Sequence, residues 1–179
     1  MVDPVAAHRL AYRLLFAALA ALILFVRILP LGAVPARVPG PDLILCGAIA
    51  WVLRRPDYAP AALIAAVFLV EDVLSMRPPG LWPLLVLLGT EFLRSREATL
   101  RDLPFALEWL VAGTLVVALT VIQRLALAIF MVPQVPVGMA ALQTVSTVLA
   151  YPAVVLLTRF VFGLRKAAPG EFDAFGRRI

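Results

Sequence analysis

Charged residues inside apolar stretches are the groups in this sequence with the clearest potential for chemistry. Glu71 and Asp72 are adjacent within a long apolar segment, and Arg27 closes an earlier one. An ionised side chain among apolar neighbours is costly and needs a partner. Neighbouring residues on a helix point about 100° apart, so Glu71 and Asp72 cannot both face one helix. We expect Arg27 to pair with Asp72 or Glu71 and to hold helices together. A proton or substrate path through these residues is one alternative, and simple exposure at the level of the lipid headgroups is the other.

Two further polar patterns lie on predicted helices. Glu91 and Arg94 are three residues apart, a spacing that allows an ion pair on one helix face. A polar stripe on the sixth predicted helix consists of residue types that usually form hydrogen bonds between helices. Its members are Gln143, Thr144, Ser146 and Thr147.

Known catalytic motifs are missing from the sequence. His8 is the only histidine and Cys46 the only cysteine, so a His-containing catalytic device or a Cys/His metal site has few residues available. There is no Gly-x-Ser-x-Gly, His-Glu-x-x-His, Cys-x-x-Cys or P-loop motif. We therefore expect no catalytic, cofactor-binding or metal-binding residues and a protein that is not an enzyme.

The composition indicates a membrane environment. Of the 179 residues, 63% are hydrophobic and only 15% are charged, and the mean hydropathy is +1.00. Soluble domains are about half apolar and about one quarter charged. The sequence thus predicts an all-α integral membrane protein that forms a single domain over residues 1–179. The net charge of +5 comes from scattered arginines, which favours contact with the lipid bilayer over contact with nucleic acid.

Uncharged stretches between charged or proline-rich turns predict six transmembrane helices. The second and fourth are short, and cross the bilayer only if arginines snorkel or the bilayer thins; a re-entrant hairpin is the alternative. A run of 34 uncharged residues after Arg124 is too long for one crossing and is divided near Pro133 and Pro136. The predicted helices cover about 10–30, 42–54, 58–76, 80–94, 104–132 and 137–162, followed by a cytoplasmic tail at 163–179.

The distribution of basic residues predicts the orientation. With six crossings and an inside N-terminus, twelve Arg and Lys residues fall on inner segments and four on outer ends. The four outer ones are Arg27, Arg37, Arg77 and Arg124. Basic residues concentrate on the cytoplasmic side of membrane proteins. We therefore expect both termini in the cytoplasm.

The order of several short motifs resembles the rod shape-determining protein MreD family. Pro41-Asp42-Leu43 opens the second helix, Arg55-Pro56 closes it, an acidic residue falls late in the third, and Pro79-Gly80-Leu81 opens the fourth. The stretch 77–96 is similar to the alphaproteobacterial branch in particular. The resemblance covers nearly the whole chain and rests on order and spacing. One departure is Phe68-Leu-Val-Glu-Asp72, which lacks the glycine that many members carry before the acidic position.

The resemblance implies a non-enzymatic scaffold of the cell-wall elongation complex in the bacterial inner membrane, which helps to maintain rod shape. The implied direct partner is MreC, and the wider complex contains MreB, RodA and a class B penicillin-binding transpeptidase. Residues expected to have structural or partner-binding roles are Arg27, Asp42, Arg55, Pro56, Glu71, Asp72, Pro79, Gly80, Glu91 and Arg94.

MreD-like proteins are also similar in fold to the S component of vitamin transporters. This similarity gives an alternative function, a small-molecule-binding component of a transporter. It predicts a polar pocket open to the outside, lined by Asp42, Glu71, Asp72 and hydroxyl groups of the sixth helix.

Overall fold

The computed structural model describes residues 4–29, 39–101 and 103–161, and this part of the chain is helical without any strand. The predicted all-α class is confirmed. The elements are α1 (Pro4–Ile28), α2 (Leu43–Arg54), the 3₁₀ turn η1 (Pro56–Tyr58), α3 (Ala61–Leu74), α4 (Leu81–Ser95), α5 (Glu97–Arg101), α6 (Phe105–Ile129) and α7 (Val137–Val161).

Three of the described helices are long and apolar enough to cross a membrane: α1 over Ala6–Ile28, and the whole of α6 and α7. Helices α2, α3 and α4 contain 12, 14 and 15 residues. At 1.5 Å per residue they extend roughly 18 to 23 Å, which is less than a hydrocarbon core of about 30 Å. Full crossing length is therefore present in three of the six predicted segments.

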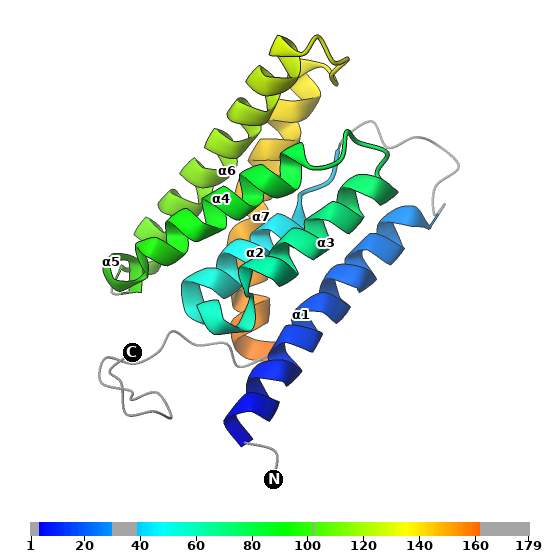
Figure 1. Ribbon diagram of the computed structural model, residues 1–179. Helices are drawn as coiled ribbons and strands as arrows, with labels where there is room; N and C mark the ends of the chain where they lie inside the picture. The colour runs from blue at the N-terminus through cyan, green and yellow to red at the C-terminus, as the bar shows by residue number, and fades with distance from the viewer. Residues whose placement is uncertain (1–3, 30–38, 102, 162–179) are drawn as a thin grey trace.

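The helices surround α2, which lies inside the bundle (Figure 1). Helix α1 packs against α3, α3 against α4, α4 against α6, and α6 against α7, while α2 contacts both α4 and α7. Ten of the 12 residues of α2 are buried, including the aromatic ring of Trp51. Thus α2, the shortest of the six predicted crossings, is the helix most enclosed by protein.

Local backbone chemistry moves several predicted boundaries. The third segment was predicted from residue 58, but Pro56 opens η1 and Pro60 adopts an extended conformation (φ −63°, ψ 153°), so α3 starts at Ala61. The fifth segment was predicted to reach residue 132, but α6 ends at Ile129, just before Met131 with its positive φ of 52°.

Two further differences concern the first helix and a loop. Helix α1 starts at Pro4, earlier than the predicted residue 10, and proline is well suited to the first turn of a helix. The charged segment between the predicted helices 80–94 and 104–132 contains the short helix α5. The predicted tail at 163–179 lies outside the described residues.

Helix α7 continues through Pro152 because another helix supplies the missing hydrogen bond. Proline has no N–H, so the carbonyl of Val148, four residues earlier, loses its helical donor. The indole N–H of Trp109 in α6 donates to that carbonyl oxygen at 2.8 Å. One side chain thereby satisfies the broken turn and joins α6 to α7.

We expect Trp109→Phe to lower the free energy of unfolding by about 1 kcal/mol, because it leaves the Val148 carbonyl without a donor. In a Pro152→Ala background the loss should be smaller, since the restored backbone N–H at position 152 can reach the same carbonyl. Unfolding of the four proteins of this double-mutant cycle in detergent micelles measures both losses. If Trp109→Phe lowers the free energy of unfolding equally in both backgrounds, the indole N–H does not replace the N–H that is missing at Pro152.

Candidate functional site

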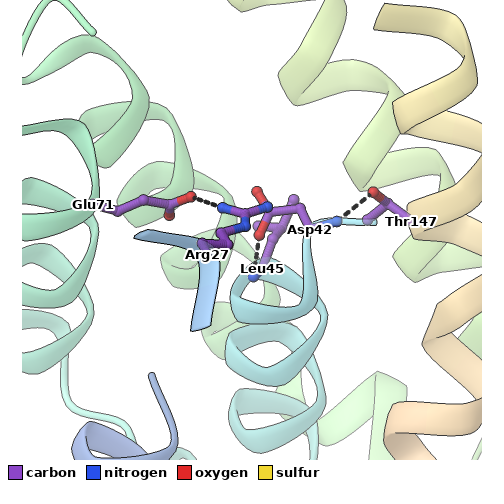
Figure 2. Close-up of polar contacts among 5 residues, drawn as sticks. All are labelled: Arg27, Asp42, Leu45, Glu71 and Thr147. Carbon is purple, nitrogen blue, oxygen red and sulfur yellow. Dashed lines mark hydrogen bonds and ion pairs between the residues drawn. The ribbon is translucent and has the colours of Figure 1, made fainter. Parts of the chain in front are cut away.

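Arg27 and Glu71 form an ion pair between α1 and α3. Nη1 of Arg27 lies 2.7 Å from Oε1 of Glu71 (Figure 2). The Glu71 side chain is fully buried, while that of Arg27 is 32% exposed. Of the two pairs that the sequence allowed, the structure forms the one with Glu71. Arg27 also lies in the last turn of α1, where a positive charge interacts favourably with the helix dipole.

Asp42 caps α2 and anchors it to α7. Its carboxyl group accepts a hydrogen bond from the N–H of Leu45 at 3.0 Å. Its backbone N–H donates to Oγ1 of Thr147 at 2.9 Å. In Figure 2, Asp42 lies between Thr147 on one side and the Arg27–Glu71 pair on the other. A cap of this kind is worth about 1 kcal/mol, and here it also sets where α2 meets α7.

Asp72 closes the turn between α3 and α4. Its Oδ2 accepts a hydrogen bond from the N–H of Gly80 at 3.1 Å. Gly80 has a φ of +106°, a conformation that favours glycine because a Cβ would be strained there. The neighbouring Pro79 is exposed in the same turn. Glu71 and Asp72 thus serve different elements, as their directions on the helix require.

A cavity of about 340 Å³ lies at the end of the bundle that holds the α3–α4 and α6–α7 turns. Asp42, Asp72, Thr144 and Thr147 contribute to its lining. Glu71 is not among the lining residues, because it is directed toward Arg27. The volume falls in the range of small-molecule sites, roughly 300–1,000 Å³.

A second buried polar network joins α2, α6 and α7. Nη1 of Arg54 lies 3.0 Å from Oε1 of Glu108, and the side chains are only 6% and 4% exposed. The hydroxyl of Tyr151 donates to the same carboxylate oxygen at 2.9 Å. Arg54 donates further to the carbonyl of Ala50 at 3.1 Å.

No pattern in the sequence predicted this network. Arg54 was counted among the twelve inner basic residues, and Glu108 was expected near the inner interface beside Trp109, with no partner assigned to either. A signal was present: Glu108 is the only charged residue between Asp102 and Arg124. In addition, a tyrosine within an uncharged helix needs a partner for its hydroxyl. These residues lie far apart in the sequence, so their spacing does not predict that they pair.

The remaining candidate residues lie near the C-terminal ends of α2 and α4, away from the cavity. Glu91 and Arg94 pair at 3.1 Å, which confirms the predicted contact. Arg94 also donates to the carbonyl of Ala59 at 2.7 Å and so joins α4 to the segment before α3. Arg55 ends α2 with its N–H bonded to the Trp51 carbonyl at 2.8 Å, and Pro56 begins η1.

A scan against protein-family models and searches of curated proteins and solved structures find no match to this chain. Within the described ranges, no group of three or more His, Cys, Asp or Glu side chains could hold a metal ion. The described polar groups form interhelical ion pairs and contribute hydrogen-bonding side chains to the cavity lining.

We expect Glu108→Gln to destabilise the protein by about 3–5 kcal/mol, because it leaves the buried guanidinium of Arg54 uncompensated. The matched control is Glu91→Gln, whose wild-type side chain is 43% exposed; it should cost less than about 1 kcal/mol. The double variant Arg54→Met/Glu108→Met should recover much of the loss by removing both charges. Unfolding in detergent micelles measures all three. Similar losses of unfolding free energy for the two single variants would show that the buried ion pair contributes no more to stability than the exposed one.

Proposed function

We propose that this chain is a non-enzymatic scaffold of the bacterial inner membrane that resembles MreD. It would bind MreC and link it to MreB and to the RodA/transpeptidase synthase during lateral cell-wall elongation. One observation carries the proposal: charged side chains join the helices inside the bundle, while the long helices turn apolar side chains outward. Such a surface is suited to packing against other membrane helices.

The outward face of α1 supports docking of a further helix. Ala11, Leu14, Ala18, Ala21 and Phe25 are exposed and follow one another at intervals of three or four residues. This spacing places them on one side of the helix. Small residues allow two helix backbones to approach closely in lipid, where no hydrophobic force drives association. The face therefore fits a single transmembrane anchor such as the one proposed for MreC.

The proposal includes six crossings with both termini in the cytoplasm. The short helix α2 is shielded by protein, so its ends need not reach the lipid surface. Helices α3 and α4 can cross where the bilayer thins or flanking arginines snorkel. The start of α1 and the end of α7 lie at the same end of the bundle (Figure 1), which agrees with an even number of crossings.

A small-molecule-binding transporter component, similar to an S component, is a second candidate. The cavity of about 340 Å³ favours it, since Asp42, Asp72 and two threonine hydroxyls contribute to its lining. The two functions make different demands on the protein. A scaffold needs its outward helix faces to bind a partner, whereas a transporter component needs the cavity to bind a solute.

Cysteine labelling tests the topology. Val135→Cys lies near the α6–α7 turn, where the wild-type side chain is 58% exposed. It should react with a membrane-impermeant maleimide in intact spheroplasts. Ala98→Cys, at an exposed position of α5, should react only after permeabilisation. The native Cys46 is fully buried and should stay silent. The opposite pattern of labelling would reverse the proposed orientation.

Affinity purification from native membranes tests the scaffold. The tagged chain should retain MreC, and Ala18→Trp on α1 should reduce the retained MreC several-fold without changing the amount of the chain. Val121→Trp, on an exposed position of α6, is the matched control and should retain MreC. If MreC is absent from the purified complex, and depletion of the chain leaves rod width and MreC localisation unchanged, the scaffold function is wrong.

A further inference from the structure

The lining of the cavity combines both signs of charge. Asp42 and Asp72 contribute two carboxyl groups, and Arg77 and Arg124 contribute two guanidinium groups. Both arginines are partly exposed, whereas both aspartates are buried. The formal charges of these four groups cancel. A ligand with one charge alone would meet repulsion from half of them, whereas a ligand carrying both charges can meet a partner for each.

Asp72 offers a buried acceptor to this cavity. The residue is 0% exposed, and its Oδ2 is bonded to Gly80. Within the described part of the chain, its Oδ1 has no hydrogen-bonding partner. A buried carboxylate oxygen without a hydrogen-bond donor is unfavourable. A protonated amine in the cavity would supply a donor and a positive charge to this carboxyl group.

Trp82 offers a buried donor to the same cavity. Its side chain lines the cavity and the residue is 5% exposed. No described residue accepts a hydrogen bond from its Nε1. The indole N–H can only donate, so its missing partner is an acceptor. Arg77 and Arg124 carry further donors, although one N–H of Arg124 is bonded to the Val135 carbonyl at 3.2 Å.

We propose that the cavity binds a small zwitterion. Its protonated amine pairs with the carboxyl group of Asp72, and its anionic group accepts from the indole N–H of Trp82. The apolar part of the ligand packs on Leu45, Leu81 and Val116, which also line the cavity.

Two sources provide this chemistry: a free amino acid, and the ethanolamine headgroup of a phospholipid. Binding here leaves the outward face of α1 free. The site is therefore compatible with the scaffold function and does not rest on it.

Calorimetric titration of the full-length chain in maltoside micelles tests the site with two soluble probes, L-leucine and glycerophosphoethanolamine. N-Acetyl-L-leucine lacks the protonated amine and is the matched control ligand. In a second arm, the chain is placed in phosphatidylglycerol nanodiscs supplemented with phosphatidylethanolamine, and mass spectrometry identifies the lipid that stays bound. We expect one molecule of at least one zwitterion per chain and no binding of the acetylated probe.

Variants show whether binding takes place in the cavity. Asp72→Asn keeps an oxygen for the Gly80 N–H but removes the charge, and should weaken binding about tenfold. Trp82→Phe removes the N–H while keeping an aromatic ring, and should weaken it about threefold. Glu91→Gln lies outside the cavity and should bind as the wild type does.

The outcomes separate the sources and decide the proposal. Binding of L-leucine assigns a free solute, and retention of phosphatidylethanolamine alone assigns a lipid headgroup. If none of these zwitterions binds, or if both cavity variants bind as tightly as the wild type, the proposed zwitterion site is wrong. Should Asp72→Asn fail to fold, Trp82→Phe decides. MreC retention is measured in a separate experiment, so a failure of zwitterion binding does not contradict the scaffold function, and a failure of MreC retention does not contradict the cavity site.

Discussion

Helix α2 is buried along nearly its whole length and carries a buried charged residue at each end, Asp42 at its start and Arg54 at its finish. Because both side chains are buried, their polar groups need partners within the protein. The Asp42 carboxyl group accepts from Leu45 of α2 itself. Thr147 of α7 accepts from the backbone N–H of Asp42, and Glu108 of α6 pairs with Arg54. The positions of α6 and α7 around α2 follow from these contacts. Apolar packing alone would allow many rotations of each helix, whereas a buried ion pair allows few.

The outer helices are joined to the bundle by the same means. Arg27 connects α1 to Glu71 of α3, and Arg94 connects α4 to the Ala59 carbonyl. These contacts lie near helix ends and leave the middle of the outward faces apolar. A membrane protein built in this way keeps its charged groups occupied and offers its surface to lipid or to other helices. This division of roles is the physical basis of the proposed scaffold.

The adjacent residues Glu71 and Asp72 show how one turn of helix can have two uses. Glu71 has a cation from another helix at 2.7 Å. Asp72, which lines the cavity, is bonded through one oxygen to the turn that follows its own helix, and its other oxygen has no described hydrogen-bonding partner. Two buried polar atoms without a described hydrogen-bonding partner, Oδ1 of Asp72 and Nε1 of Trp82, belong to residues that line the cavity. A ligand would complete there what the helices complete elsewhere.

The sequence by itself determined the helical class, the approximate extent of six helical segments and the Glu91–Arg94 contact. These features depend on neighbouring residues: runs of apolar side chains, prolines that end helices, and a spacing of three. It also reduced the partner of Arg27 to two adjacent carboxyl groups. Only the tertiary structure chose Glu71, joined Arg54 to Glu108 and Tyr151, and placed Trp109 at the carbonyl that Pro152 leaves without a donor. Such contacts depend on the rotation and depth of each helix, which packing against other helices sets and local sequence does not.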